Sequence, residues 1–385
     1  MRIAHVITRL IVGGAQENTL ASVIGLRRKP GLEVTLVSGP TFGPEGSLEP
    51  LLAHHPRVLT VVPELVRPVH PWKDWIAWRR LRALFRAQTP QIVHTHSGKA
   101  GILGRLAAAQ AGVPVIIHTI HGPSFGSFQA WPANFTFKTA ERAAARVTTH
   151  FVVVADAMKT QYLAAGIGSP DRYTKVYSGF ALEPYRFAPN DLELRARLGL
   201  APEDIVVGKI ARLFKLKGHD DLFAVAPQLI RDCGALKFLL LGDGPWRGRF
   251  EDRARALGLS RHFVFAGLVP PADVPRFVGV MDLLVHLSSR EGLPRALPQA
   301  LAAGKPVVAY DCDGANEVCR ADETGFLIAP GDLPSLRQAL LRLARDAQLR
   351  RRLGENGQRF VLARFGVDQM VDELYELYLR LAGGV

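Results

Sequence analysis

Cysteine is scarce in this sequence. Its 385 residues include only Cys233, Cys312 and Cys319. An odd number of widely spaced cysteines matches neither a disulfide framework nor a zinc-binding pattern. We therefore interpret all three as reduced structural thiols, and we exclude the class of small secreted proteins that disulfides hold together.

Long apolar runs are also missing. No run approaches the roughly 20 residues that a membrane-spanning helix needs. The first residues, Arg2 to Thr8, have the pattern of a buried strand rather than that of a signal peptide. We therefore expect a cytoplasmic protein, either free or bound peripherally to the inner face of the cytoplasmic membrane.

Acidic residues are outnumbered, and the imbalance is uneven along the chain. The net charge is +13, and residues 1–185 hold 20 Lys and Arg residues against 10 Asp and Glu residues. Such an excess attracts nucleic acids, anionic membranes or phosphate-bearing substrates. The sequence has no recognition-helix, RRM or KH pattern, so we expect no nucleic-acid partner.

A short stretch of the basic half combines tryptophan with arginine. Trp72, Trp75 and Trp78 precede a run of arginines that begins at Arg79. Rings and cations in this combination suit an anionic membrane surface. The same pattern suits a surface helix with its tryptophans in the core and its arginines in water. The sequence leaves both interpretations open.

The remaining sequence alternates between short β-branched runs and helical patterns. This alternation predicts βαβ units with parallel sheets, and the length exceeds what one core usually serves. We predict an α/β protein with two Rossmann-like, doubly wound domains, residues 1–180 and 190–364, facing each other across a cleft. Residues 365–385 form an amphipathic segment that we expect to pack back on the first domain. The predicted strands are 2–7, 33–37, 58–62, 91–95, 114–119, 150–154, 205–210, 236–241, 262–266, 282–287 and 306–310.

Two loops of the first half carry histidine at predicted strand ends. One contains His94 and His96, and the next contains His118 and His121. Histidine is a common zinc ligand, but there is no HExxH motif and no carboxylate nearby. We also expect the alternation along the strands to separate His94 and His118 from the other two. We therefore predict no metal site, and we predict that His121 contacts substrate.

Polar loops also follow the predicted strands of the second half. Arg212 and Lys217 are spaced to close on one diphosphate, although a solvated basic loop explains them equally well. The glycine-rich turn at 242–245 lacks the GxGxxG spacing of a dinucleotide site. Glu291 precedes Gly292 and a helix expected near Pro294, so this loop offers a carboxylate to hydroxyls and free amides to an anion.

These motifs, in this order, resemble the GT-B retaining glycosyltransferases of family 4. The resemblance covers nearly the whole chain, and residues 94–105 are similar to bacterial members that build lipid-linked oligosaccharides, exopolysaccharide or lipopolysaccharide. The matching motifs are Gly13-Gly14, Thr119 to Gly122, Ala211 to Leu213 with Lys217-Gly218, Gly242 to Pro245, Glu291 to Pro294 and Ala303 to Val307.

The resemblance implies transfer of a sugar, with retention, from a nucleotide diphosphate donor to a glycan or lipid-linked acceptor. It implies no metal and no cofactor beyond the donor itself. The implied catalytic residues are His121, Arg212, Lys217 and Glu291. The implied donor-binding residues are Gly13, Gly14, Gly242, Gly244, Gly292, Leu293, Pro294 and Gln299, and we place Gln16 and Lys99 on the acceptor side.

One position departs from the family pattern. Gln299 stands where the family has a second glutamate, eight positions after Glu291. That acid usually binds the nucleotide ribose, and a neutral amide still donates and accepts hydrogen bonds there. We therefore expect altered donor affinity or nucleotide preference rather than loss of activity.

A DxD sequence, Asp311-Cys312-Asp313, suggests metal-dependent GT-A enzymes. We interpret it as the turn after the 306–310 strand. Two other functions remain open: another GT-B enzyme, such as a nucleotide-sugar 2-epimerase or an inverting transferase, and a non-catalytic basic binding protein.

Overall fold

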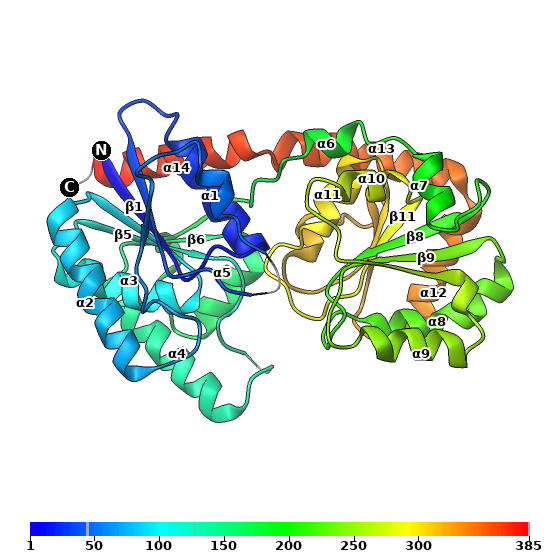
Figure 1. Ribbon diagram of the computed structural model, residues 1–385, viewed down its shortest axis with the longest axis horizontal. Coiled ribbons are helices and arrows are strands. Elements are labelled where there is room, and N and C mark those ends of the chain that lie inside the picture. The colour runs from blue at the N-terminus through cyan, green and yellow to red at the C-terminus, as the bar shows by residue number, and fades with distance from the viewer. Residues whose placement is uncertain (44–45, 127, 384–385) are drawn as a thin grey trace. The chain divides into compact units, whose positions relative to one another are not determined.

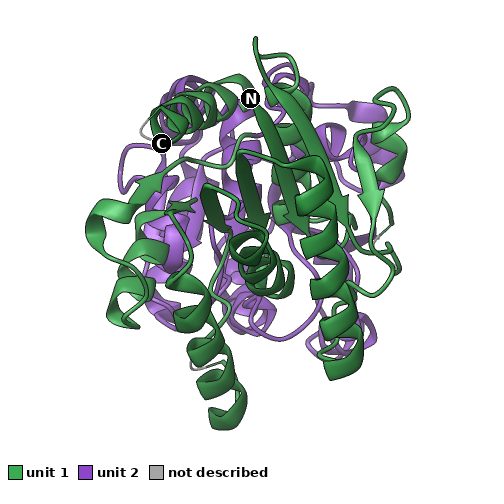
Figure 2. Cartoon of the chain, turned by 90° about the vertical axis from the view of Figure 1, so that its left-hand side faces the viewer, with its two compact units in different colours: residues 1–179, 367–385 green, residues 180–366 purple. Residues whose placement is uncertain are grey.

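The computed structural model describes residues 1–43, 46–126 and 128–383. The chain forms two compact units (Figures 1 and 2). Unit 1 contains residues 1–179 together with 367–385, and unit 2 contains residues 180–366. Each unit is an α/β structure with its own parallel sheet.

Unit 1 has a seven-stranded sheet in the order β3-β2-β1-β4-β5-β6-β7, with every neighbouring pair parallel. Its strands are β1 (Arg2–Ile7), β2 (Glu33–Ser38), β3 (Leu59–Val61), β4 (Ile92–His96), β5 (Val115–Ile120), β6 (His150–Val153) and β7 (Tyr173–Lys175). Its α-helices are α1 (Gly14–Leu26), α2 (Pro71–Gln88), α3 (Gly98–Gln110), α4 (Trp131–Ala145), α5 (Asp156–Ala164) and α14 (Val367–Ala382).

Helices cover both faces of this sheet, and the side-chain alternation of the strands explains how. Ile3 and Ile7 of β1 face a cluster that includes residues of α1 and α14, whereas Ala4 and Val6 face a second cluster built with α2 and α3. Helix α14 packs beside α1, and its Met370 belongs to the first cluster (Figure 1). The C-terminal segment is therefore part of the core of unit 1.

Unit 2 has a six-stranded sheet in the order β10-β9-β8-β11-β12-β13, also parallel throughout. Its strands are β8 (Ile205–Ile210), β9 (Leu236–Leu241), β10 (Phe263–Gly267), β11 (Leu283–His286), β12 (Val307–Tyr310) and β13 (Gly325–Ile328). Its α-helices are α6 (Glu183–Arg186), α7 (Leu192–Arg197), α8 (His219–Asp232), α9 (Arg247–Ala256), α10 (Val274–Gly279), α11 (Ala296–Ala302), α12 (Leu333–Arg345) and α13 (Ala347–Arg364).

Both sheets contain a point where the strand order reverses. In unit 1 it lies between β1 and β4, and in unit 2 between β8 and β11. The loops on either side of such a point lead to helices on opposite faces, which leaves a crevice for ligands at the carboxyl ends of the strands. The loops after these four strands are therefore the places to look for a site.

Most of the predicted elements are confirmed, and the differences are local. All eleven predicted strands are present, but the edge strands β7 and β13 were not predicted. Helix α2 buries Leu81 and Phe85, as its core-facing stripe predicts, whereas Trp72 and Trp75 are 64% and 42% exposed. The interpretation that puts the tryptophans in the core is therefore wrong for these two residues.

Among the described residues, no helix is both long enough and apolar enough to cross a membrane.

Candidate active site

The loop after β8 is joined to the glycine-rich loop after β9. The Leu213 amide donates to the Asp243 carbonyl at 3.0 Å, and the Trp246 amide donates to the Leu213 carbonyl at 3.0 Å. Gly242 has a φ of 129°, and a Cβ there would lie 2.3 Å from the Ala211 carbonyl oxygen. Only glycine allows this approach. Gly242 and Gly244 therefore shape the loop that supports Arg212.

Arg212 is exposed near the start of the loop after β8. Its guanidinium carbon lies 4.9 Å from the centre of the Phe214 ring, and its backbone carbonyl accepts a hydrogen bond from His219 Nε2 at 3.1 Å. The guanidinium has no hydrogen bond or ion pair with another described residue. Its N–H donors are therefore available to an anion from outside the protein.

Lys217 and Glu291 meet across the switch point of unit 2. The Lys217 ammonium contacts Glu291 Oε1, and His286 Nε2 lies 3.5 Å from the same oxygen. Burial alone would raise the pKa of the Glu291 carboxyl, but the contacts with His286 and Lys217 outweigh burial and hold this pKa well below its usual range. Glu291 is thus an ionised hydrogen-bond acceptor at physiological pH.

The turn after β12 holds the Glu291 loop in place. The Glu291 amide donates to Asp313 Oδ2 at 2.7 Å, and the Gly314 amide donates to the Gly292 carbonyl at 3.0 Å. β12 ends at Tyr310, and a short 3-10 helix begins soon afterwards at Asp313, as the turn interpretation predicts. The Asp313 carboxylate therefore supports the Glu291 loop.

The rest of the Glu291 loop turns inward. Leu293 and Pro294 are buried, and α11 begins two residues after Pro294 at Ala296. Gln299 lies within this helix and is 8% exposed. The position that departs from the family pattern is therefore nearly enclosed by protein.

The sequence analysis missed one charged residue that interacts electrostatically with Lys217 and Glu291. Lys209 of β8 is 1% exposed, and its ammonium has no hydrogen-bond partner among the described residues. Burial, followed by the charge of Lys217, lowers the pKa of Lys209 to about 7. The signal was a lysine within an otherwise apolar predicted strand.

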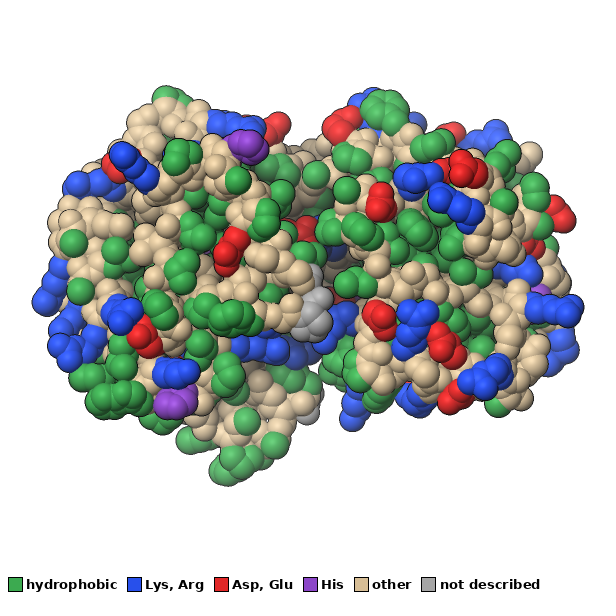
Figure 3. Space-filling model, in the orientation of Figure 1, with side chains coloured by type: hydrophobic (Ala, Val, Ile, Leu, Met, Phe, Trp, Pro, Cys, Tyr) green, Lys and Arg blue, Asp and Glu red, His purple; other side chains and the backbone are tan. Residues whose placement is uncertain are grey.

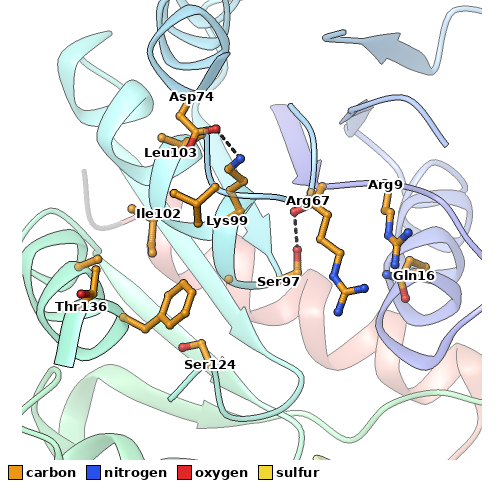
Figure 4. A pocket seen from close by; sticks show the side chains of 15 residues that line it. Arg9, Gln16, Arg67, Asp74, Ser97, Lys99, Ile102, Leu103, Ser124 and Thr136 are labelled. Atoms are coloured by element: carbon orange, nitrogen blue, oxygen red, sulfur yellow. Dashed lines mark hydrogen bonds and ion pairs between the residues drawn. The ribbon is translucent and has the colours of Figure 1, made fainter. Parts of the chain in front are cut away.

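Unit 1 has a cavity of about 580 Å³ next to its own switch point (Figure 4). Thr8 follows β1 and Ser97 follows β4, and their hydroxyl oxygens are 3.0 Å apart at the cavity wall. The lining residues are Thr8, Arg9, Gln16, Arg67, Val69, Asp74, Ser97, Gly98, Lys99, Ile102, Leu103, Ser124, Thr136, Phe137 and Ala140. Most of the wall is apolar, with basic groups on one side.

The basic side chains of this cavity differ in whether other residues of unit 1 compensate their charge. The Lys99 ammonium contacts Asp74 and donates to the Val66 carbonyl at 2.8 Å, so its charge is compensated within unit 1. Arg67 has no hydrogen bond or ion pair with another described residue. Figure 4 shows Arg9 next to Gln16, with Arg67 between them and Ser97. Arg67 is thus better placed than Lys99 to meet an anionic ligand.

His121 follows β5 directly and is half-buried. Its Nε2 lies 3.0 Å from His96 Nδ1, and His94 and His96 stack with a centroid distance of 4.4 Å. The predicted separation of these histidines is therefore wrong, because His94 and His96 are two residues apart and share one face of β4. Only His118 points to the opposite face, where its Nδ1 lies 2.9 Å from Thr95 Oγ1.

The predicted site residues are divided between the two units. Gly13 caps α1 of unit 1, which also holds Gly14, Gln16, Lys99 and His121. The others lie in unit 2, where Lys217 contacts Glu291 directly.

Family models match residues in both units. The family model described as Glycosyltransferase Family 4 matches residues 12–183, and the model described as Glycosyl transferases group 1 matches residues 190–360. The UDP-Gal:alpha-D-GlcNAc-diphosphoundecaprenol alpha-1,3-galactosyltransferase of Escherichia coli is 29% identical over 323 residues, which are 83% of this chain and 82% of that protein. The capsular polysaccharide biosynthesis glycosyltransferase CapM of Staphylococcus aureus is 23% identical over 355 residues, or 91% and 90% of the two chains.

Solved structures with the same fold cover nearly the whole chain. Anabaena Alr3699/HepE in complex with UDP has a TM-score of 0.82 at 24% identity, covering 98% of this chain and 99% of that one. The sucrose-phosphate synthase of Thermosynechococcus elongatus has a TM-score of 0.81 at 18% identity and covers 100% of both chains. Together, the two family models span most of the sequence. The chain therefore belongs to the group 1, family 4 glycosyltransferases and has their GT-B fold of two α/β domains.

Proposed function

We propose that this enzyme transfers a sugar from a nucleotide diphosphate sugar to a lipid-linked or polysaccharide acceptor, with retention and without a metal ion. The observation that carries the proposal is the cluster at the switch point of unit 2. There, the free guanidinium of Arg212 lies on the loop that leads to Lys217, and Lys217 contacts the ionised Glu291.

The donor would meet this cluster through its charge and its hydroxyl groups. Arg212 supplies a planar fork of N–H donors to a diphosphate, and Lys217 supplies a compact positive charge. Glu291 accepts hydrogen bonds from sugar hydroxyls. UDP in the Anabaena structure and UDP-Gal in the name of the E. coli relative support a nucleotide diphosphate donor.

The same groups support metal independence. Arg212 and Lys217 would neutralise the diphosphate where a GT-A enzyme needs a divalent ion. Asp313 is occupied with the Glu291 amide. Since the protein supplies the positive charge itself, transfer should proceed in EDTA.

In the proposed reaction, the bond between the anomeric carbon and the phosphate oxygen breaks as a new bond to the acceptor oxygen forms on the same face. The proton of the acceptor hydroxyl passes to an oxygen of the departing phosphate. No protein nucleophile takes part. Arg212 and Lys217 stabilise the negative charge that grows on the leaving group, which is electrostatic transition-state stabilisation.

The acceptor would enter the cavity of unit 1. Ile102, Leu103 and Phe137 give it apolar walls, and Arg9 and Arg67 provide positive charge. This combination suits an acceptor with a lipid and an anionic group. The name of the E. coli relative includes such an acceptor, a diphosphoundecaprenol, and CapM is named for capsular polysaccharide.

Helix α2 would bring unit 1 to an anionic membrane surface. Trp72 and Trp75 are exposed and stack with ring centroids 5.0 Å apart, and the Arg79 guanidinium lies 4.8 Å from the Trp75 ring. Figure 3 shows Lys and Arg side chains beside exposed hydrophobic ones over this helix. Aromatic and basic groups together favour the interface of an anionic bilayer.

A transfer assay tests the proposal. The purified enzyme would be incubated in EDTA with UDP-, GDP- or ADP-sugars and lipid diphosphate acceptors, and the anomeric configuration of the product would be read by NMR. We expect one donor family to react and to keep the donor configuration. Arg212→Ala should lower the rate on the order of 100-fold.

Arg351→Ala is the matched control, because Arg351 is exposed on α13 away from the β8–β11 switch point. A wild-type rate for Arg212→Ala would show that the donor site is misassigned. Release of a free, epimerised sugar without acceptor would instead indicate another GT-B enzyme, such as a 2-epimerase.

A further inference from the structure

A connected series of side chains lies beneath the switch point of unit 1. It joins strands β1, β4 and β5 to helix α14. Its members, in order of contact, are His121, His96, His5, Tyr378, His94 and Thr119. All are buried except His121, which is half-buried at the carboxyl end of β5.

The contacts form one unbranched chain, here called the histidine array. His121 Nε2 is 3.0 Å from His96 Nδ1, and His96 Nε2 is 2.9 Å from His5 Nδ1. His5 Nε2 is 3.3 Å from the Tyr378 hydroxyl, which also contacts His94 Nδ1. His94 Nε2 ends the array at 2.6 Å from the Thr119 hydroxyl.

The rings of the array are neutral at physiological pH. Burial lowers the pKa of His5 to about 3 and that of His121 to about 4, and it lowers the pKa of His94 and His96 as well. A neutral imidazole has one N–H donor and one acceptor nitrogen. The Tyr378 hydroxyl has one hydrogen to donate, and when this hydrogen is used within the array, every contact must donate in the same direction. Two such arrangements, here called polarities, are possible.

The two polarities differ in free energy, because they require different histidine tautomers. If donation runs from His121 towards Thr119, all four rings carry their proton on Nε2, which is the more stable tautomer of a free histidine side chain. The opposite polarity needs the Nδ1–H tautomer four times. The first polarity also lets the Tyr378 hydroxyl donate to His94, the closer of its two contacts, and accept from His5.

We propose that the histidine array fixes His121 as the Nε2–H tautomer, so that its Nδ1 is held as a hydrogen-bond acceptor for a substrate hydroxyl. Nδ1 of His121 has no hydrogen-bond partner among the described residues. His5, His94, His96, Thr119 and Tyr378 are then positioning residues that act through His121. That the hydroxyl belongs to a sugar or acceptor rests on the proposed function.

A metal ion is the competing use of these rings. The nearest ring nitrogens of His5, His94 and His96 lie within 4.8 Å of one another. Yet both ring nitrogens of each already have a hydrogen-bond partner. A metal-bound nitrogen cannot carry a proton, so an ion would break the array. The proposal therefore requires the purified protein to hold no stoichiometric metal here.

Tyr378→Phe is the most informative change. It leaves His5 without a partner for Nε2, and a buried N–H without an acceptor costs more than a buried lone pair without a donor. The array between His5 and His121 should then reverse, which gives His121 an Nδ1–H. Nitrogen-15 NMR of the histidine rings distinguishes the two tautomers directly in the ligand-free protein.

We expect His121 to be Nε2–H in the wild type and to gain a substantial Nδ1–H population in Tyr378→Phe. Tyr375→Phe is the control, because it removes a phenol from the same helix whose hydroxyl donates to the Pro30 carbonyl at 3.2 Å, outside the array. If Tyr378→Phe fails to fold, Thr119→Val removes the acceptor at the other end and should shift the same tautomer.

The kinetic consequence separates this role from a merely structural one. If nine-tenths of His121 lost its acceptor, kcat/KM would fall about tenfold. The same Tyr378→Phe change should have no further effect in a His121→Ala background, because its action passes through that ring.

Three results would overturn the proposal: an Nδ1–H His121 in the wild type, a tautomer unaltered in both Tyr378→Phe and Thr119→Val, or a stoichiometric metal bound to these rings. The failure of the proposed function looks different. If the tautomer behaves as expected but His121→Ala transfers sugar normally, the array stands and the substrate contact of His121 is wrong.

Discussion

Replacing Lys209 by methionine should stabilise unit 2, most strongly at acidic and neutral pH. Lys209 is 1% exposed, and its ammonium lacks a hydrogen-bond partner among the described residues. Methionine is only one atom shorter than lysine, is flexible enough to fill most of the same space, and carries no charge. Burial, together with the nearby Lys217, lowers the pKa of Lys209 from 10.5 to about 7. At about 1.4 kcal/mol per pKa unit, the charged form in the folded protein is disfavoured by roughly 5 kcal/mol.

The pH dependence follows from the direction of this shift. Below pH 7 the lysine is protonated in both the folded and the unfolded state, so the folded protein bears the whole cost. Between about pH 7 and 10.5 the folded protein has released the proton while the unfolded chain still holds it. Wild-type stability should therefore rise with pH in this window, by at most about 1.4 kcal/mol per pH unit from this residue.

Equilibrium unfolding in guanidinium chloride at pH 6 and pH 9 measures the effect. We expect Lys209→Met to be more stable than the wild type by a few kcal/mol at pH 6, with a gain about 3 kcal/mol smaller at pH 9. Lys237→Met, which removes a lysine of β9 whose ammonium donates to the Arg261 carbonyl at 2.9 Å, should show no such change with pH. A Lys209→Met protein that is less stable at pH 6, or whose gain is equal at both pH values, would refute the reasoning.

Three further predictions concern other parts of the molecule. Glu291→Gln should keep the fold but lower transfer on the order of 100-fold in the same sugar-transfer assay, since the ionised acceptor is lost; near-normal turnover would remove Glu291 from the mechanism. Glu141→Gln should cost roughly 3–5 kcal/mol in denaturant unfolding, because it leaves the fully buried Arg105 without its carboxylate; a change below 1 kcal/mol would contradict this. Trp72→Ala combined with Trp75→Ala should weaken co-sedimentation with phosphatidylglycerol vesicles while leaving transfer to a water-soluble acceptor intact; unaltered sedimentation would rule out α2 as the membrane contact.

The strands were predictable because most of them are buried on both faces. Every residue of β4 and β5 is buried, and apart from His94, His96 and His118 these strands appear in the sequence as apolar or β-branched runs. The missed strands, β7 and β13, have three and four residues and lie at the sheet edges. An edge strand needs less apolar surface, so its sequence gives a weaker signal.

The contact between Lys217 and Glu291 has a topological reason. Lys217 and Glu291 are far apart in sequence, but each follows a strand at the switch point of unit 2, and the structure places them in contact. Whether a charged side chain is paired within the protein was not predictable. Lys99, for example, is paired with Asp74, which comes from a different helix.

The histidines illustrate the main limit of the sequence. His5 and His94 are neighbours only because β1 and β4 pair in register, and Tyr378 reaches them from the C-terminal helix. No local pattern indicates such a contact. The buried histidines of β1, β4 and β5 were the available signal, and their meaning depends on the packing of α14.

Binding of nucleoside diphosphates is the most direct test of the central claim, that unit 2 holds a metal-independent donor site built on Arg212. Thermal unfolding of the wild type, Arg212→Ala and Arg351→Ala would be followed with UDP, GDP, ADP and their sugar conjugates, with and without EDTA. A ligand that binds only the folded state raises its stability. We predict a rise in Tm with one nucleotide family, equal in EDTA, present in Arg351→Ala and lost in Arg212→Ala. A rise that needs a divalent ion, or one that Arg212→Ala retains in full, would contradict the account.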